Sequence, residues 1–543
     1  MKIEELEAIV ERTQAGALSP EDQERLRSAI ETLGWLTNAI GEKSASIARL
    51  QQILFGAKTE KASRVLCQEP EGDRPGSSRA PKEKQKGHGR NGAAAYPGAE
   101  RIRVPHESLK AGCRCPECKR GKVYLLNEPR RIVRVTGQAP LRARIFEKET
   151  LRCNLCGEVF PAKSPEGIGE KKYGASAGAM IGLLKYGTGT PFNRLEGLQG
   201  NLGIPLPAAT QWEIVEEAAE EIAPVHDELV RQAAQGEVLH NDDTPMTILA
   251  LLGGSKKAAV AEEIEPGEDV GDEEATERTG IFTSGIVSTR EGLRIGLFFT
   301  GSKHAGENLT DVLRKRASEL PPPIQMCDAL SRNSPDSAFE TVLGNCVGHG
   351  RRKFVHLVEI FPEECRYVIE KLRDVYRNEA IARERKLSPE ARLEFHQKES
   401  AEIMGDLRTW MEGKLNRKEV EPNSPIGGAM KYMLKHWEKL TLFLRKAGAP
   451  LDNNLCERAL KKAILHRKNA LFYKTENGAR VGDVFMSLIH TAELNSVNAF
   501  EYLTELLEHP EDLKRDPASW MPWNYRAKIE ARAAGSGPSA QPP

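Results

Sequence analysis

The sequence predicts a multidomain α+β protein, in which an α/β core is interrupted by helices and preceded by helical and cysteine-rich segments. The chain has 543 residues, which corresponds to roughly three to five domains at about 100 to 200 residues each. Strand-like runs alternate with helical patterns in the second half of the chain. Five of the ten cysteines fall between Cys113 and Cys156. These observations exclude a single small domain.

The composition is that of a folded protein with no net charge. Lys and Arg number 78, as do Asp and Glu, and 39% of the residues are hydrophobic, which excludes wholesale disorder. A neutral total does not exclude a nucleic-acid partner, because phosphate binding depends on where the basic residues are concentrated. The first fifteen residues contain no apolar signal segment, and no later apolar run is long enough to span a bilayer. We therefore expect a cytoplasmic protein with no membrane partner.

The N-terminal hundred residues predict a helical arm and a linker. Apolar residues between Leu26 and Leu54 recur at alternating steps of three and four, the spacing of a leucine-zipper-like coiled coil. Two glycines and a lysine within this seam leave an amphipathic helix packed on its own domain equally open. Residues 67–99 are rich in Gly, Pro, Ser and basic residues and predict a flexible basic linker. Its segment 79–90 is either a solvated tether or a phosphate contact.

The clustered cysteines predict a structural zinc site. Cys115 and Cys118 form one CxxC pair, Cys153 and Cys156 form a second, and a stretch with strand character separates them. Four thiolates in two such pairs suit tetrahedral Zn²⁺ and are typical of a zinc ribbon. Cys113 is an alternative ligand to Cys115. A complete thiolate shell leaves no open position for a substrate, so the predicted role is structural.

Residues 171–235 predict a helical, helix-turn-helix-like segment. A helical pattern at 191–199 is followed by a glycine-containing turn and by a second helical pattern that begins before Trp212. An ordinary pair of packed helices explains the same pattern equally well, because the turn is long and no base-reading side chain can be named.

The next segment predicts a sheet. Strand-like runs at 237–249, 279–287 and 293–300 are followed by a helical pattern at 308–320 and by a buried strand at 323–329. This order is compatible with an RNase-H-like core. In that architecture, carboxylates on neighbouring strands converge at one end of the sheet.

Three acidic residues are the candidate catalytic groups. Asp242 interrupts the first strand, Asp328 ends the last one, and Glu457 opens a much later helix. The long separation of Asp328 from Glu457 predicts that residues 355–450 are a helical insertion. Three converging carboxylates repel one another unless they hold cations, and oxygen ligands suit Mg²⁺ or Mn²⁺. Taken alone, a capping box formed by Asn454 and Glu457 and ordinary turn carboxylates explain these residues better.

Two basic clusters are candidates for DNA contacts. One follows a possible strand and the other belongs to the Glu457 helix and its end, and a solvated basic face is the simpler explanation of either cluster alone. The predicted DNA-binding residues are Arg351, Arg352, Lys353, Arg458, Lys461, Arg467 and Lys468. We interpret the neighbouring Cys346 and His349 as a packed cysteine and a hydrogen-bonded histidine, because no second ligand pair lies near them in the sequence.

The combination of motifs resembles a known family. FGAKTEK, the paired cysteine motifs, HNDDTPM, QMCDA, CVGHGRRKF, DNNLCERALK, HRKNALF and SLIHTAELNSVNAFEYL run through nearly the whole chain. Together they resemble the bacterial DDE transposases of the family named after insertion sequence 66. The resemblance implies an RNase-H-like core with an inserted helical domain, two divalent metals and recognition of terminal inverted repeats. It also maps the catalytic triad onto Asp242, Asp328 and Glu457.

The resemblance further implies target DNA as a partner, a homo-oligomer, accessory proteins of the same element and a location at the bacterial nucleoid. Two departures stand out. Asp243 occupies a position where the family usually has glutamate, and Cys113 adds a thiol to the first cysteine pair. The acidic loop 261–277 has no function that we can assign.

The predicted domain boundaries follow from these segments. They are 1–66 for the helical arm, 67–99 for the linker, 100–170 for the zinc ribbon, 171–235 for the helix-turn-helix-like segment, 236–354 and 451–508 for the two parts of the core, 355–450 for the helical insertion and 509–543 for a C-terminal tail.

The predicted activity is metal-dependent DNA cleavage and strand transfer. In this reaction, hydrolysis at the ends of the element exposes 3′-hydroxyls, which then attack target phosphodiesters. One alternative is a catalytically inactive, zinc-containing DNA-binding or assembly protein derived from a transposase. Another is a nuclease that never joins ends.

Overall fold

The computed structural model describes residues 171–252 and 280–535, together with the short stretches 110–114, 120, 122, 139–147, 149–152 and 159–163. The described residues divide into two compact units, which are treated separately below. Four predictions lie outside the described residues: the helical arm, the basic linker, the four zinc ligands and the acidic loop. In the part that is described, no helix is both long and apolar enough to cross a membrane.

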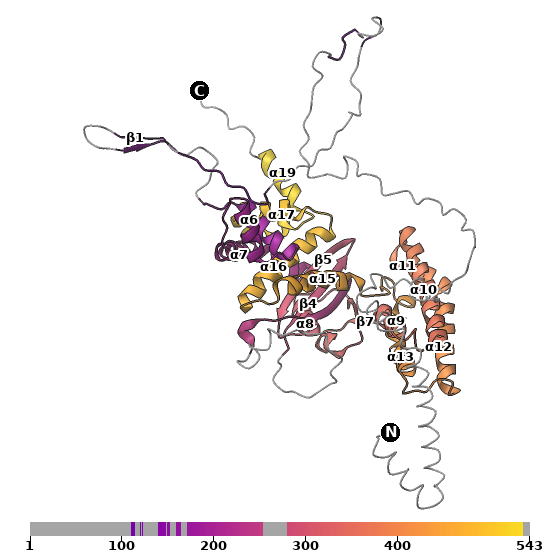
Figure 1. Cartoon of the computed structure of the whole chain (residues 1–543). Coiled ribbons are helices and arrows are strands. Elements are labelled where there is room, and N and C mark those ends of the chain that lie inside the picture. The colour runs from indigo at the N-terminus through magenta and orange to yellow at the C-terminus, as the bar shows by residue number, and fades with distance from the viewer. Residues whose placement is uncertain are drawn as a thin grey trace, which may run out of the picture. The chain divides into compact units, whose positions relative to one another are not determined.

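The larger unit is built on a mixed five-stranded sheet (Figure 1). Its strands are β3 (Val238–Pro245), β4 (Phe282–Arg290), β5 (Leu293–Gly301), β6 (Ile324–Cys327) and β7 (Val342–Asn345), in the order β5-β4-β3-β6-β7. The first three form an antiparallel meander, and β6 and β7 continue the sheet parallel to β3. The α+β class and the strand-like runs are confirmed, with the strand ends shifted by a few residues.

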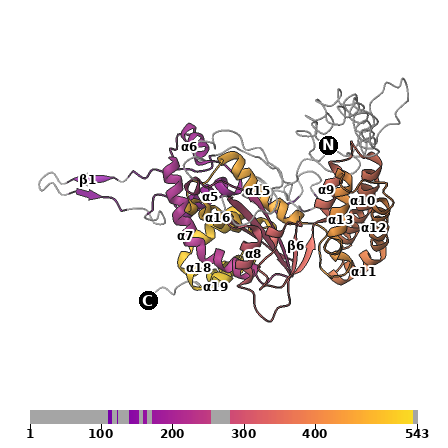
Figure 2. The same cartoon turned by 90° about the horizontal axis from the view of Figure 1, so that it is seen from below.

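Two helices cover opposite faces of this sheet (Figure 2). They are α8 (Ala305–Leu313) and α15 (Asn454–Ala470). Ser284 of β4 accepts a hydrogen bond from Asn308 of α8, whereas the next residue, Gly285, accepts one from the thiol of Cys456 on α15. Neighbouring residues of a strand point to opposite faces, so the two helices lie on opposite sides.

Gly285 allows α15 to approach the sheet closely. A Cβ atom at this position would lie 3.0 Å from Leu460 and 3.3 Å from the sulfur of Cys456. Both distances are tighter than ordinary van der Waals contact, so a larger residue would push the helix outward.

Helix α16 (Glu476–Leu494) lies along β5, at one edge of the sheet. At every fourth position, a polar side chain on or just beyond this helix accepts a hydrogen bond from a backbone N–H of β5. The pairs are Asp483 with Thr300 at 2.7 Å, Ser487 with Phe298 at 3.0 Å, Thr491 with Gly296 at 3.0 Å and Asn495 with Arg294 at 3.3 Å. We call these four residues the α16 polar ladder.

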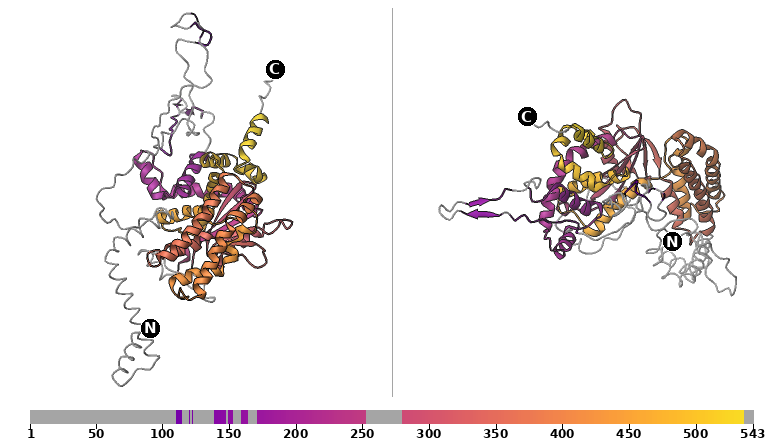
Figure 3. Two further views of the ribbon diagram at one scale, coloured as in Figure 1. Left: turned by 90° about the vertical axis from the view of Figure 1, so that its right-hand side faces the viewer. Right: turned by 90° about the horizontal axis from the view of Figure 1, so that it is seen from above.

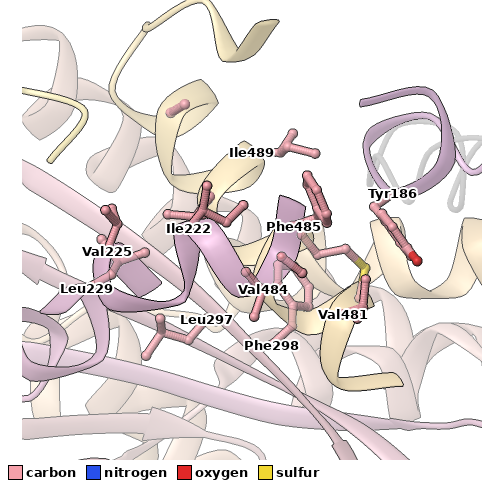
Figure 4. Packing of buried hydrophobic residues seen from close by; sticks show 14 of the residues in the cluster. Tyr186, Ile222, Val225, Leu229, Leu297, Phe298, Val481, Val484, Phe485 and Ile489 are labelled. Atoms are coloured by element: carbon pink, nitrogen blue, oxygen red, sulfur yellow. The ribbon is translucent and has the colours of Figure 1, made fainter. Parts of the chain in front are cut away.

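The main core lies between α16, the sheet and the helices that precede it. These helices are α5 (Ala175–Gly182), the π-helix η2 (Leu183–Gly187), α6 (Phe192–Asn201) and α7 (Ala208–Ala233). Figure 4 shows Ile222 and Leu229 of α7 beside Val484 of α16 and Leu297 of β5, all fully or nearly fully buried. The apolar stripe of α7 thus holds it against the edge of the sheet that α16 covers.

The C-terminal residues belong to the same core. After α17 (Ala499–Glu508), the chain forms α18 (Pro510–Arg515) and α19 (Tyr525–Gly535). Trp520 is fully buried and Tyr525 is nearly so, and both pack in the main core. The segment that the sequence analysis set apart only as a tail is therefore helical and packs against the core as far as Ile529.

Residues 355–450 are helical, as their amphipathic patterns predict, and their role as an insertion stays a prediction. The helices are α9 (Val347–Val355), α10 (Pro362–Glu384), α11 (Pro389–Glu399), α12 (Ala401–Asn416), α13 (Pro425–Lys435) and α14 (Trp437–Leu440). The smaller unit contains α10, α12 and most of α13. Tyr367 of α10 contacts Trp410 of α12, with ring centroids 4.5 Å apart, and buried Leu372 and Met411 extend this core.

The cysteine-rich region is described only around its cysteine pairs. Strands β1 (Thr150–Arg152) and β2 (Val159–Pro161) form an antiparallel hairpin that flanks the second pair (Figure 3). An isolated bridge between Arg114 and Lys122 flanks the first pair. Cys113, which is described, is exposed and not in a disulfide.

Candidate active site

Asp242 and Asp243 are neighbours on β3, and their side chains point to opposite faces of the sheet. Asp242 is paired with Gly285 on β4, and Asp243 is paired with Ser284. Directly opposed residues of antiparallel strands share a face. Asp242 therefore faces α15, the helix that carries Glu457, and Asp243 faces α8.

The carboxylate of Asp243 has cationic or hydrogen-bonding partners within the protein. Its Oδ2 lies 2.9 Å from Nδ1 of His304, and its Oδ1 lies 3.5 Å from a guanidinium nitrogen of Arg332. The side chain is only 1% exposed. The carboxylate thus links β3 to the start of α8 and to the segment after β6, which is a structural arrangement.

Asp242, in contrast, has negatively charged neighbours. Burial and the charge of Asp328 raise the pKa of Asp242 to about 8, and Asp243 and Glu457 add to the rise. The backbone N–H of Asp243 donates to Oδ1 of Asp242 at 2.9 Å and opposes this rise. Asp328 and Glu457 therefore both lie near enough to disfavour a negative charge on Asp242. A bound cation would relieve this repulsion.

Asp328 follows the last residue of β6 and is held by its own loop. Its Oδ1 accepts hydrogen bonds from the backbone N–H of Leu330, at 3.1 Å, and from the side-chain amide of Asn333. Asn333 in turn accepts, through its backbone carbonyl, a hydrogen bond of 2.8 Å from the side chain of Asn241 on β3. The loop carboxylate is thus tied to the strand that carries Asp242.

Glu457 lies in the first turn of α15, and Asn453 fixes that turn to the sheet. The amide of Asn453 donates to the backbone carbonyl of Asn241 at 3.0 Å, and its oxygen lies 3.2 Å from Nδ1 of His240. All three of these residues are buried. In the sequence, Asn453 stands out only as part of the motif DNNLCERALK. The sequence signal for its anchoring role was a run of Asp and Asn residues directly before a helix. Side chains at this position often form hydrogen bonds with backbone groups that have no partner within the helix.

His349 and Cys346 lie beside Glu457, which the sequence analysis did not anticipate. Nδ1 of His349 is 3.7 Å from Oε1 of Glu457, and ligand atoms of the three residues all lie within 4.8 Å of one another. Such a group could hold a metal ion. Burial raises the pKa of Cys346 to about 12, and its sulfur accepts the N–H of Asn453 at 3.3 Å. The buried cysteine agrees with a packing role, whereas His349 joins the candidate site.

The predicted DNA-binding residues of α15 differ in their surroundings. Arg458, Lys461 and Lys468 are exposed, and within the described part of the chain no carboxylate pairs with them. Arg467 points back to the strand that carries Asp242, where it donates to the backbone carbonyl of Pro245 and to the hydroxyl of Thr244 at 3.3 Å. Its guanidinium therefore also joins α15 to β3.

The other basic cluster lies on the second half of α9, in the smaller unit. Arg351 is buried, Arg352 is half-buried and Lys353 is exposed. The ammonium of Lys353 lies 4.6 Å from the ring centre of Tyr432, a cation–π contact. DNA binding by these residues stays a prediction.

Helices α6 and α7 follow one another in the segment predicted to be helix-turn-helix-like, with Gly203 at φ +73° in the connection. However, α7 carries seven Asp or Glu residues and a single Arg. Acidic side chains are repelled by phosphates. The charge of α7 therefore favours an ordinary pair of packed helices over a pair that recognises DNA through α7. DNA binding by this segment stays a prediction.

These features define a mixed α+β protein in which a buried carboxylate of the central sheet, Asp242, has other acidic residues near it. The sequence model described as "Transposase IS66 family" matches residues 171–261 and 294–481, which is 279 of the 543 residues. The matched region contains Asp242, Asp328 and Glu457. The chain belongs to the IS66 family of transposases.

Three similar proteins from Sinorhizobium fredii are described as uncharacterised. The protein y4jD is 31% identical over 196 residues, which cover 35% of this chain and 38% of y4jD. The protein y4hP is 24% identical over 447 residues, which cover 76% of this chain and 73% of y4hP. The protein y4qI is 29% identical over 194 residues, which cover 34% of this chain and 35% of y4qI. They add no information on chemistry.

Proposed function

We propose that this transposase cleaves and joins DNA at the terminal inverted repeats of its element by a DDE mechanism, with Asp242, Asp328 and Glu457 as the catalytic acids. The proposal rests on one observation. Asp328, on the loop after β6, and Glu457, on the distant helix α15, both act on Asp242 of β3 and raise its pKa. The strand order β5-β4-β3-β6-β7, with a three-stranded meander followed by two parallel strands, supports an RNase-H-like core.

The donor set suits Mg²⁺ or Mn²⁺. Carboxylate oxygens are hard ligands, and the crowding of three of them is costly without a cation. Asp242, Asp328 and Glu457 would hold these ions. When bound, the ions would activate the attacking oxygen and stabilise the leaving oxygen.

The protein's own contribution is to hold the acids in position. Asn333 and the N–H of Leu330 orient the carboxylate of Asp328. Asn453 anchors the turn that carries Glu457, and His349 lies beside the Glu457 carboxylate. Preorganised ligands do not have to rearrange during the reaction, which is how a rigid site lowers a barrier.

DNA is the proposed substrate, both as inverted repeats and as target. Arg458, Lys461 and Lys468 form an exposed basic face on the helix that carries Glu457. This face would bind phosphates next to the site of cleavage. A homo-oligomer and accessory proteins of the same element are further proposals that follow from the family.

We also propose a structural Zn²⁺ held by Cys115, Cys118, Cys153 and Cys156, with Cys113 as the alternative to Cys115. The bridge between Arg114 and Lys122 and the β1–β2 hairpin give each pair a flanking backbone pairing, as a zinc ribbon requires. The test is the zinc content of the purified protein by elemental analysis. One equivalent should be lost in a variant with Cys153→Ser and Cys156→Ser.

The central experiment is cleavage of a DNA duplex that carries the element's terminal repeat, followed by a plasmid assay for joined products. We expect Mg²⁺-dependent nicking at the end of the repeat and transfer of the 3′ end. Asp242→Asn should bind the repeat but not cleave it. Binding without cleavage by the unaltered protein would instead support a DNA-binding or assembly protein. Cleavage without joined products would support a nuclease.

A further inference from the structure

The end of α15 has an unusual backbone conformation. Leu471 has φ +68° and ψ −48°, and the N–H of Phe472 donates to the carbonyl of Ala470 at 2.8 Å. Leu471 is therefore the central residue of a γ-turn with positive φ, a rare and strained turn. Its side chain is 62% exposed. An exposed leucine gains no burial in return for this strain.

The turn is held firmly on both sides. The N–H of Leu471 donates to the carbonyl of Arg467 at 2.8 Å. Two residues further on, Tyr473 exchanges backbone hydrogen bonds of 2.9 Å with Thr247 and Leu249, in the segment that follows β3. Strained conformations persist where the surrounding structure determines them, and they are concentrated at functional sites. The position of the Leu471 side chain is thus built into the fold.

A basic stripe connects this leucine to the candidate active site. Arg458, Lys461, Leu465 and Lys468 are all exposed, and at 100° per residue they fall within an arc of about 80° on α15. The neighbouring Lys462, outside this arc, is paired with Glu493 at 2.7 Å. Among the described residues no carboxylate neutralises the three bases of the stripe. Such a stripe is complementary to a phosphate backbone.

The length of the helix sets the register of the DNA. Leu471 follows Glu457 by fourteen residues, which corresponds to about 21 Å along α15 at 1.5 Å per residue. A duplex that runs along the stripe advances about 3.4 Å per base pair, so this length spans about six base pairs. Proteins that bind the minor groove frequently insert an apolar side chain, leucine among them, between two base pairs and partly unstack them.

We propose that Leu471 is an apolar wedge that enters the DNA duplex about six base pairs from the phosphate at Glu457 and unstacks one base step. This inference rests on the proposed function, because it takes the DNA to be bound along α15 at the catalytic acids. The strained turn presents the leucine before DNA arrives, so little ordering is needed on binding. The wedge would locally distort the duplex and help to place the scissile phosphate.

The test uses the full-length protein and a terminal-repeat duplex in which 2-aminopurine replaces one base at a time, from three to nine base pairs from the cut. Without Mg²⁺, the unaltered protein should raise the fluorescence near the sixth position, since 2-aminopurine brightens when unstacked. Leu471→Ala should lose most of this rise while keeping its affinity within about threefold. With Mg²⁺, the variant should cleave about tenfold more slowly, and a mismatch at the same position should restore the rate.

Leu293→Ala is the matched control, because Leu293 is also an exposed leucine, at the start of β5. It should change neither fluorescence nor cleavage. Thermal denaturation shows whether each variant is folded. The proposal is overturned if the unaltered protein brightens no position, or if Leu471→Ala brightens the same position equally. Failure of the proposed function looks different, because the unaltered protein would then cleave no duplex, whatever the fluorescence.

Discussion

Two buried carboxylates, Asp483 on α16 and Asp242 on the central sheet, have similarly raised pKa values for different reasons. Burial raises the pKa of Asp483 to about 7, although two hydrogen bonds from Thr300 oppose the rise. Burial raises the pKa of Asp242 to about 8, but there the neighbouring acids, with Asp328 foremost, add to the effect. Asp483 has its hydrogen-bond donors within the fold. Asp242 lies among like charges, which a cation would compensate.

The comparison shows that a perturbed pKa alone does not identify a catalytic residue. Structural and functional groups both carry such shifts. The charge of the neighbours distinguishes them here: the α16 polar ladder places an acid opposite N–H and O–H donors, and the candidate active site places an acid opposite other acids.

The largest expected effect concerns activity. Asp242→Asn should reduce DNA cleavage by at least about 10³-fold, because it removes a member of a group that acts as a unit. Asp483→Asn, a matched change of a buried carboxylate, should leave cleavage within about threefold. The measurement is single-turnover cleavage of a terminal-repeat duplex. Equal losses in both variants would contradict the distinction drawn above.

The second effect concerns metal binding. Mg²⁺ at about 100 times its dissociation constant should stabilise the unaltered protein by about 2.7 kcal/mol, since a ligand that binds only the folded state adds to its stability. Removal of Mg²⁺ with a chelator should reverse the gain. Thermal denaturation with and without Mg²⁺ measures it. Asp483→Asn should retain the response and Asp242→Asn should lose most of it; a full response in Asp242→Asn would argue against a site at this acid.

The third effect concerns pH. The ordinary pKa of Asp483, 3.8, rises to about 7 on folding, so the folded state holds the proton more tightly and stability falls as the pH rises from about 4 to 7. Three pKa units set an upper bound of about 4 kcal/mol, and we expect about 2 kcal/mol after local relaxation. In Asp483→Asn, the side chain at position 483 is not ionisable, so this contribution to the pH dependence of stability is absent.

The stability of Asp483→Asn relative to the unaltered protein should therefore grow across this pH range and level off above it. Chemical denaturation at pH 5 and pH 8 measures the difference. A constant difference would show that the ladder does not depend on the charge of Asp483.

The smallest effect concerns the approach of α15. Gly285→Ala should cost about 1 kcal/mol of stability, because its Cβ would lie 3.0 Å from Leu460. It should also weaken Mg²⁺ binding by displacing the helix that carries Glu457. Gly296→Ala is the matched control on β5, the strand that packs against the α16 polar ladder. The added Cβ would lie 2.6 Å from His490 of α16. It should destabilise the fold and leave Mg²⁺ affinity unchanged. Equal Mg²⁺ affinity in both variants would contradict this role for Gly285.

The strands and helices could be predicted from local pattern, since alternating and helical periodicities are properties of neighbouring residues. The strand carrying Asp242 and the helix carrying Glu457 were recognisable in this way. The side-chain network was not, because Asn453 meets His240 and Asn241 across more than 200 residues of sequence. The proximity of His349 to Glu457 likewise depends on the packing of two distant segments.

The α16 polar ladder is an intermediate case. Asp483, Ser487, Thr491 and Asn495 recur every four residues within a mainly apolar segment, and this spacing is visible in the sequence. Their partners are not, because β5 precedes them by almost 200 residues. Polar residues that recur on a buried helix predict that each side chain has a hydrogen-bond partner. The pattern does not identify that partner.

The same ladder determines how molecules of this protein can associate. Unpaired N–H groups at a sheet border invite a strand from a second molecule, a common route to aggregation. Because the four side chains already accept these groups along β5, that border is closed to strand addition. A second molecule that associated with this one would therefore have to join through helices, loops or the opposite border at β7.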